Sequence, residues 1–423
     1  MLITVAFSEE HIMTTGLAGP TLAEFIAARD VVSAVAQKTP IEESRYLSGI
    51  LGVDVVLKCE NLQRTGAYKI RGAYNRMSKL SPDERARGVV AASAGNHAQG
   101  VALAAHELGI KSTIFMPMGV ALPKLLATKD YGAEVMLLGP TFTESLAAAK
   151  EFAEKTGAVF IPPFDNADII AGQGTVGLEI FEQVSDVETV IVPIGGGGLI
   201  SGVASAMKQH AAENGRAIRI IGVQSANAAA YPPSLRAGEP TTIEMKPTIA
   251  DGIAVARPGA LNFAIIKDTV DEVVTVGDDD IARALVMLLE RAKLVVEPAG
   301  AVGVAAILAE KIDAVGKTVV VLSGGNIDPM LMERVIARGL VTTGRYMRMR
   351  IPLPDRPGQL AKISEILANQ NSNVVEVMHT RHGTDLQITQ AELEIHIETR
   401  GPEHASEVLE ALRAEGFEPR VDF

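Results

Sequence analysis

One stretch decides the fold of this chain: Glu60-Asn61-Leu62-Gln63-Arg64-Thr65-Gly66-Ala67-Tyr68-Lys69-Ile70-Arg71-Gly72-Ala73. It follows an apolar run at 53–57 that predicts a strand, and it leads into a helical pattern that continues to Lys79. Lys69 therefore stands near a helix start, where the helix dipole and the apolar wall of Tyr68 both favour the neutral amine, the form that attacks carbonyl groups. Most lysines at such a position are simply solvated, so the accompanying motifs decide what Lys69 does.

Three further stretches place small residues where a predicted strand ends and a predicted helix begins. They are Ser93-Ala94-Gly95-Asn96-His97-Ala98-Gln99-Gly100 after the run 88–92, Gly195-Gly196-Gly197-Gly198-Leu199 after 191–194, and Ser323-Gly324-Gly325-Asn326 after 319–322. The carboxyl ends of parallel strands form the crevice in which α/β sheets bind their ligands. The three stretches and Lys69 therefore predict one shared site.

The four stretches, in this order, resemble the fold-type II pyridoxal-phosphate enzymes and, within them, the threonine/serine dehydratases, over about residues 20–340. The resemblance implies an α/β fold like that of the tryptophan synthase β subunit, with two open lobes. It also implies pyridoxal 5'-phosphate as cofactor. The activity implied is the removal of water and ammonia from L-threonine to give 2-oxobutanoate, and from L-serine to give pyruvate.

The same resemblance implies a role for each motif residue. Lys69 is expected to hold the cofactor and then to remove the Cα proton as general base. Tyr68, which stands where phenylalanine is commoner, is expected to pack on the cofactor ring, Asn96 to bond its 3-oxygen, and Ser323 to meet its ring nitrogen. The residues expected at the substrate are Ser93, Ala94, Gly95, Asn96 and His97 for its carboxylate, and Gly252, in the stretch 250–255, for the rest of its pocket.

The chemistry of two motifs agrees with these roles. Side-chain-free residues at a helix start let successive N–H groups converge on an anion, which suits a phosphate at Gly195, Gly196, Gly197, Gly198 and Leu199. A dinucleotide fingerprint is the rival interpretation, but Ile200 stands where the last glycine of G-x-G-x-x-G belongs. A serine at the ring nitrogen leaves the ring neutral, which favours prompt loss of a β-hydroxyl over transamination.

Composition limits the remaining classes of function. The 423 residues are 47% hydrophobic and 21% charged, with a net charge of -12, which argues against nucleic acid and anionic membranes as partners. No run reaches the roughly 20 apolar residues that a membrane span requires. The single cysteine, Cys59, cannot form an internal disulfide, so we expect a cytoplasmic protein.

Strand-like and helical runs alternate along most of the chain, which predicts parallel sheets. We expect an N-terminal extension at 1–20, a catalytic domain at 21–340 and, inside it, a smaller lobe at about 60–155 within a larger lobe. The segment from Tyr231 to Pro258, rich in Pro and Gly, is expected to be a loop or lid.

Beyond Gly344 the pattern changes to βαββαβ, with the turn Asp355-Arg356-Pro357-Gly358 after the first strand. This order resembles an ACT domain, a module that binds amino acids between paired copies, so residues 345–423 are expected to be regulatory. A branched amino acid or a product-related molecule is the expected effector, and a homodimer or homotetramer the expected assembly. A purely dimerising role is the alternative for this module.

Two other functions compete. Serine racemase, or an L-serine dehydratase, uses the same scaffold, but the racemase needs a second proton-transferring serine where this chain has Ala94. Its acidic metal ligands fall on Gln224 and Ala230, so no metal site is expected. A non-catalytic amino-acid sensor, working through its C-terminal module, is the second alternative, and the intact motif at Lys69 argues against it.

Overall fold

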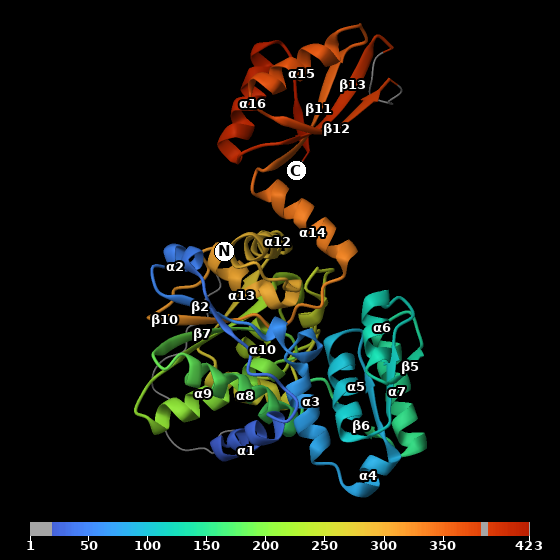
Figure 1. Cartoon of the computed structure of the whole chain (residues 1–423), viewed down its shortest axis with the longest axis vertical. Coiled ribbons are helices and arrows are strands. Elements are labelled where there is room, and N and C mark those ends of the chain that lie inside the picture. The colour runs from blue at the N-terminus through green and yellow to red at the C-terminus, as the bar shows by residue number, and fades with distance from the viewer. Residues whose placement is uncertain (1–18, 382–387, 423) are drawn as a thin grey trace. The chain divides into compact units, whose positions relative to one another are not determined.

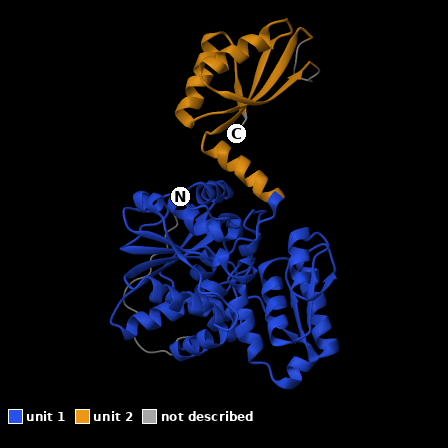
Figure 2. Cartoon of the chain, in the orientation of Figure 1, with its two compact units in different colours: residues 1–329 blue, residues 330–423 orange. Residues whose placement is uncertain are grey.

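The computed structural model of the chain describes residues 19–381 and 388–422, so most of the expected extension at 1–20 lies outside the described residues. The chain divides into two compact units, residues 1–329 and 330–423 (Figure 2). The predicted boundary, at 340–345, lies after a helix that belongs to the second unit, α14 (Pro329–Thr342). Each unit has its own hydrophobic core.

The larger lobe of the first unit is built on a six-stranded sheet in the order β1-β2-β10-β7-β8-β9. All neighbours are parallel except β1, which pairs antiparallel with β2. The strands are β1 (Ile41–Glu43), β2 (Val55–Lys58), β7 (Val187–Pro193), β8 (Arg219–Ser225), β9 (Glu272–Val276) and β10 (Lys317–Val321). The central strands are buried along nearly their whole length, which is why they appear in the sequence as continuous apolar runs.

Helices accompany this sheet in the alternating order of a doubly wound fold. They are α1 (Leu22–Val32), α2 (Arg45–Leu51), α8 (Ala167–Gln183), α9 (Gly198–Glu213), α10 (Tyr231–Ala237), α11 (Ala260–Thr269), α12 (Asp278–Met287), which continues as a π-helical turn (Leu288–Ala292), and α13 (Pro298–Leu308). Short 3-10 turns lie at Glu60–Leu62, Arg64–Gly66, Ala226–Ala228 and Asp251–Ile253. The loop prediction for 231–258 was wrong at α10, whose Pro232 and Pro233 stand in the first turn, where proline is tolerated.

The smaller lobe, drawn in cyan and teal in Figure 1, is a four-stranded parallel sheet in the order β5-β4-β3-β6. Its strands are β3 (Val89–Ala92), β4 (Ser112–Met116), β5 (Glu134–Leu137) and β6 (Val159–Phe160), and its helices are α3 (Lys69–Ser78), α4 (Pro82–Arg87), α5 (Asn96–Leu108), α6 (Leu122–Asp130) and α7 (Phe142–Thr156). The predicted alternation of strands and helices is therefore confirmed in both lobes.

The second unit has the predicted βαββαβ order after α14. Its elements are β11 (Tyr346–Pro354), α15 (Gln359–Asn369), β12 (Asn373–Thr380), β13 (Gln390–Glu398), α16 (Pro402–Ala414) and β14 (Arg420–Asp422), in an antiparallel sheet of order β12-β13-β11-β14. Side chains along β11 and β13 alternate between buried and partly exposed, because one face of the sheet packs into the core with α15 and α16.

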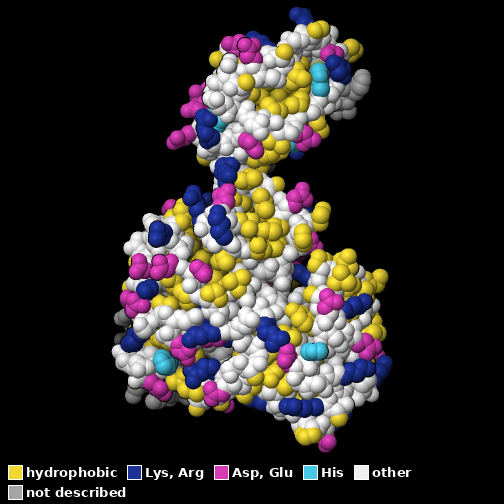
Figure 3. Space-filling model, viewed as in Figure 1, with side chains coloured by type: hydrophobic (Ala, Val, Ile, Leu, Met, Phe, Trp, Pro, Cys, Tyr) yellow, Lys and Arg dark blue, Asp and Glu magenta, His cyan; other side chains and the backbone are white. Residues whose placement is uncertain are grey.

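No helix in the described ranges is long and apolar enough to cross a bilayer. In Figure 3 the Lys and Arg side chains are scattered among acidic and apolar ones on the face in view.

Candidate active site

Lys69 is the first residue of α3, and its backbone is held by two close helix contacts. A Cβ on Gly100 of α5 would lie 3.1 Å from the Lys69 carbonyl carbon, and a Cβ on Gly72 would lie 2.3 Å from the Gln173 amide of α8. A side chain at Gly72 would clash with α8, and one at Gly100 would push α5 away from α3 by a few tenths of an ångström. The Gly72 of the deciding stretch thus helps to place Lys69.

The Lys69 side chain is partly buried, and its Nζ donates to the Pro163 carbonyl at 2.9 Å. The Tyr68 ring centre lies 5.2 Å from the same nitrogen. Burial lowers the pKa of Lys69 from 10.5 to about 8, although the negative charge of Glu297 opposes the shift. A neutral amine is therefore accessible near physiological pH, and burial is the cause.

Asn96 is the first residue of α5, and two residues hold its side-chain amide. The Asn96 Nδ2 donates to Glu297 Oε1 at 2.6 Å, and the Asn96 Oδ1 accepts from Asn326 Nδ2 at 2.9 Å. Asn326 closes the Ser-Gly-Gly-Asn stretch. Two of the four motifs are therefore joined by a direct hydrogen bond.

Ser323 lies directly beside the lysine stretch. Its carbonyl accepts from the Tyr68 N–H at 3.3 Å, and Gly324 forms an isolated antiparallel bridge with Ala67. Ser323 as a whole is 4% exposed, and none of the described residues hydrogen-bonds its hydroxyl, which leaves that hydroxyl available to a ligand.

The glycine run forms the turn between β7 and α9 and presses against protein on one side. A Cβ on Gly196 would lie 2.5 Å from the Phe164 ring, and one on Gly197, at φ +103°, would lie 2.1 Å from the Tyr231 hydroxyl. No side chain caps α9, and among the described residues none accepts from the N–H groups of 195–199. These amides are consequently free to bind an anion.

Contacts tie the glycine run to the rest of the site. A Cβ on Gly195 would lie 3.0 Å from Ile253, the neighbour of Gly252, and a Cβ on Gly252 would lie 3.6 Å from Glu297 Oε1. Phe164, which lies against the run, directly follows Pro163, the acceptor for Lys69.

The loop before α5 supplies the remaining predicted residues. The Ser93 hydroxyl accepts from the Gly95 N–H at 3.1 Å, and Ser93, Ala94 and Gly95 are partly exposed. His97 is buried and its Nε2 lies 2.9 Å from the Ile161 carbonyl. Burial, assisted by the positive charge of Lys69, lowers the pKa of His97 to about 3, so this side chain stays neutral and anchors the loop.

Three neighbours of the site had no role assigned from the sequence: Asn326, Pro163 and Tyr231, whose hydroxyl donates to the Gly196 carbonyl at 3.1 Å. Glu297 also had no role assigned from the sequence. A signal existed for Asn326, which stands inside a motif, and for Glu297, an acidic residue among apolar ones. Pro163 and Tyr231 carry no local signal.

Comparison with known proteins identifies the family. A sequence profile described as pyridoxal-phosphate dependent enzyme matches residues 32–324. The chain belongs to this family of enzymes. A second profile, the ACT domain, matches residues 349–417 of this pyridoxal-phosphate dependent enzyme and confirms the predicted C-terminal module.

Individual proteins similar to this pyridoxal-phosphate dependent enzyme include an L-threonine ammonia-lyase, a threonine deaminase and a serine racemase. An L-threonine ammonia-lyase of Thermotoga maritima is 48% identical over 402 residues, which cover 95% of this chain and 99% of that protein. The structure of the processed form of threonine deaminase isoform 2 from Solanum lycopersicum has a TM-score of 0.71 at 37% identity, covering 79% of this chain and 99% of that one. The structure of maize serine racemase has the same TM-score at 36% identity, covering 77% of this chain and 99% of that one.

The residues present fit the cofactor of the family. The site offers an amine with a lowered pKa at Lys69, free amides at 195–199 for a phosphate, and at Ser323 a hydroxyl that no described residue hydrogen-bonds, for a ring nitrogen. In the described part of the chain, no three His, Cys, Asp or Glu side chains are grouped so that they hold a metal.

Proposed function

We propose that this enzyme is an L-threonine ammonia-lyase, which converts L-threonine to 2-oxobutanoate and ammonia and also accepts L-serine, giving pyruvate. The observation that carries the proposal is the match to the Thermotoga maritima L-threonine ammonia-lyase, because it runs through both units of the chain and covers 99% of that relative. The convergence of Lys69, Asn96 and Ser323 supports it.

Each motif then has a task. Lys69 would hold the cofactor, Tyr68 would pack on its ring, Asn96 would bond its 3-oxygen and Ser323 would meet its ring nitrogen. The phosphate is held by the amides of Gly195, Gly196, Gly197, Gly198 and Leu199. Bound pyridoxal phosphate draws electrons from the substrate Cα.

Lys69 carries the proton transfer. Its amine would remove the Cα proton of the bound substrate as general base, for which a pKa of about 8 is well matched to neutral pH. The Cα proton and the β-hydroxyl together make up the water that is lost. The enamine that remains takes up water and releases ammonia, so the net products are 2-oxobutanoate and ammonia.

The substrate carboxylate is assigned to the loop Ser93–His97, and Gly252 to the wall of the substrate pocket. The neutral His97, bonded to the Ile161 carbonyl, holds the loop in place.

Ala94 separates the proposal from serine racemase, which the fold alone does not, since solved structures of both kinds match equally well. Inversion at Cα needs a proton donor on the face opposite Lys69. Ala94 has no proton to give, so elimination is the reaction that the site supports.

The second unit is assigned to regulation by an amino-acid effector bound between paired ACT domains, which requires a homodimer or homotetramer. The strand β12 lies at the edge of its sheet and exposes Val375 and Val377, so it is open to pairing. We place the protein in the cytoplasm, on the single buried Cys59.

A substrate panel tests the proposal. Purified enzyme is incubated with L-threonine, L-serine or D-serine, and 2-oxo acid formation and serine inversion are measured in parallel. We expect 2-oxobutanoate from L-threonine, pyruvate from L-serine, no inversion, and no product with Lys69→Ala. Inversion of serine as the main reaction, or no product from L-threonine, would refute it.

A further inference from the structure

Glu297 is a buried carboxylate that points away from the helix it precedes. It occupies the N-cap position of α13 and is 4% exposed, but its side chain does not cap that helix. Its N–H donates to the Gly324 carbonyl at 2.9 Å, and its Oε1 instead accepts from Asn96 Nδ2 at 2.6 Å. The carboxylate is therefore directed at Asn96, although an N-cap acid ordinarily serves its own helix.

The Asn96 amide is oriented from both ends of a hydrogen-bond chain. Asn326 Nδ2 donates to the Thr65 carbonyl at 2.6 Å and to Asn96 Oδ1 at 2.9 Å. A carbonyl oxygen can only accept, so the Asn326 side chain must direct its Nδ2 toward Thr65. The same Nδ2 then donates to Asn96, which must therefore direct its Oδ1 toward Asn326. At the other end an ionised Glu297 also only accepts, so Asn96 must give it an N–H. One N–H of Asn96 remains for another partner.

The structure makes room for this carboxylate. A Cβ on Gly324 would lie 2.4 Å from Glu297 Oε1. Any larger residue at 324 would displace the side chain, so the glycine next to Ser323 serves the placement of Glu297 as well as the turn.

Four charged or titratable groups face Glu297: Asp251, Lys124, Lys69 and Tyr68. Burial, reinforced by Asp251, raises the pKa of Glu297 to about 7, while Lys124, the Asn96 hydrogen bond and Lys69 oppose the shift. In return the carboxylate raises the pKa of the Lys69 amine against the effect of burial. Burial and then Glu297 raise the pKa of Tyr68.

We propose that Glu297 is a positioning residue of this site: it turns the Asn96 amide so that an N–H faces the cofactor 3-oxygen, and in its ionised form it places a negative charge beside Lys69. The inference rests on the proposed function, because it takes Asn96 to face the cofactor. Glu297 acts through Asn96 and through the field at Lys69.

Three substitutions separate charge from position. Glu297→Gln keeps the shape and the hydrogen-bond acceptor but removes the charge. Glu297→Asp keeps the charge but shortens the side chain by one methylene group. Asn326→Ala removes the hydrogen bond that holds the Asn96 oxygen. Glu239→Gln is the matched control, since Glu239 is exposed. For each purified holoenzyme we would measure cofactor content, the midpoint pH at which the visible band of the bound cofactor changes, kcat and KM.

We expect Glu297→Gln to lower the midpoint by about one pH unit, a tenfold change in proton affinity, because the proton near Lys69 loses its counter-charge. Glu297→Asp and Asn326→Ala should keep the midpoint and lower kcat about tenfold with KM within about twofold, since Asn96 is left free to turn. The control should match wild type.

An unchanged midpoint in Glu297→Gln, or unchanged kcat in both other variants, would overturn the inference. If Glu297→Gln fails to retain cofactor, the other two variants decide. A wild-type protein without cofactor or product would instead refute the proposed function, so the two failures are distinguishable.

Discussion

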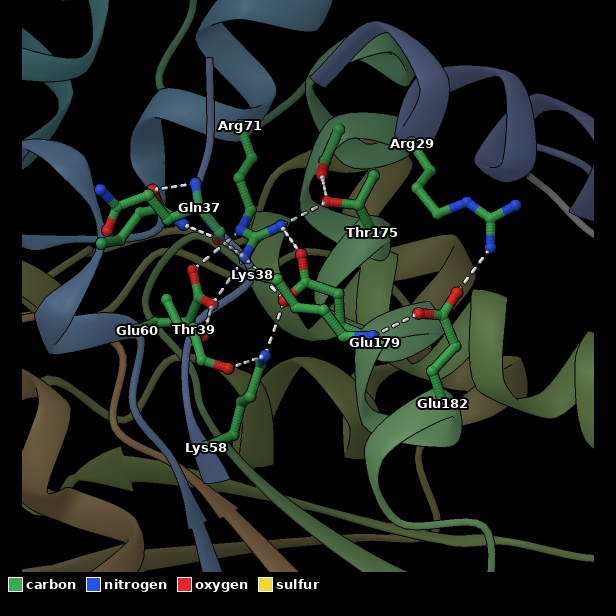
Figure 4. Close-up of polar contacts among 12 residues, drawn as sticks. Arg29, Gln37, Lys38, Thr39, Lys58, Glu60, Arg71, Thr175, Glu179 and Glu182 are labelled. Carbon is green, nitrogen blue, oxygen red and sulfur yellow. Dashed lines mark hydrogen bonds and ion pairs between the residues drawn. The ribbon is translucent and has the colours of Figure 1, made fainter. Parts of the chain in front are cut away.

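Arg71 provides the sharpest prediction for stability. This side chain is 1% exposed and donates to two carboxylates: to Glu60 at 2.9 Å and 2.8 Å, and to Glu179 at 2.6 Å and 3.0 Å (Figure 4). It also donates to Thr175 Oγ1 and to the Gln37 carbonyl. The Arg71→Met substitution keeps much of the volume and removes every one of these bonds.

The two carboxylates differ in what remains to them. Among the described residues, Glu179 keeps Lys58 Nζ at 2.6 Å, whereas Glu60 keeps the Thr39 hydroxyl at 2.6 Å and the charge of Lys58, with which it forms no hydrogen bond. Removing one partner of a buried ion pair costs about 3–5 kcal/mol, because the other charge is left uncompensated. We expect Arg71→Met to lower the free energy of unfolding of the first unit by about this amount, with Glu60 the main cause.

The pH dependence has a definite sign. Burial alone would raise the pKa of Glu60, but the charge and hydrogen bonds of Arg71, with Lys58 and Thr39, lower it overall. A carboxylate with a lowered pKa stabilises the fold above its unfolded pKa of about 4, and this stability is lost as the pH falls through the folded pKa. The difference in free energy of unfolding between wild type and Arg71→Met should therefore be largest at neutral pH and small in acid.

Denaturant unfolding followed by circular dichroism, with limited proteolysis to separate the two units, measures the effect. Arg64→Met is the matched control, because the Arg64–Glu107 pair is only partly buried and such pairs are worth at most about 1 kcal/mol. The double variant Arg71→Met with Glu60→Gln should recover most of the loss. A cost of Arg71→Met below about 1 kcal/mol, or no recovery in the double variant, would refute the reasoning.

Three further outcomes follow from the site and the second unit. Gly197 has φ +103°, and a Cβ there would lie 2.1 Å from the Tyr231 hydroxyl, so Gly197→Ala should strain the backbone amides assigned to the phosphate by about 1–3 kcal/mol. Cofactor retention on dialysis should fall at least about tenfold. Unchanged retention would count against the phosphate assignment. In protein stripped of cofactor, the rate of acetylation of Lys69 should rise with a midpoint near pH 8, the pKa that burial produces, and a midpoint near 10.5 would contradict it. Removal of residues 345–423 should abolish any response to isoleucine and valine while leaving L-threonine turnover, and an unchanged response would place the effector elsewhere.

Much of the fold was predictable because its strands are buried on both faces. The strand predicted at 88–92 contains β3 (Val89–Ala92), and the strand predicted at 319–322 overlaps β10 (Lys317–Val321). The strand β9 was missed: it is a five-residue edge strand whose burial is interrupted. The helix α10 was missed because Pro232 and Pro233 indicate a break unless they stand in the first turn, and only the tertiary fold shows that they do.

The motifs of the site were visible in the sequence, but their mutual arrangement was not. Asn96 bonds Glu297 and Asn326, which are 201 and 230 residues away, and no local period relates such positions. The apparent purpose of the glycines also differs in detail, because Gly196 and Gly197 make room for Phe164 and Tyr231 as well as freeing amides. Packing between distant segments decides both features.

Asn326 lies close in sequence to the boundary between the two units. It orients Asn96 and bonds the Thr65 carbonyl four residues before Lys69, and the second unit begins four residues after it, at Met330. The intervening segment is short, and its Ile327 N–H donates to the Gly325 carbonyl at 2.9 Å. Since an effector acts only through a difference in affinity between two arrangements, we expect one bound to the second unit to act on Asn96 only if its binding moves this segment.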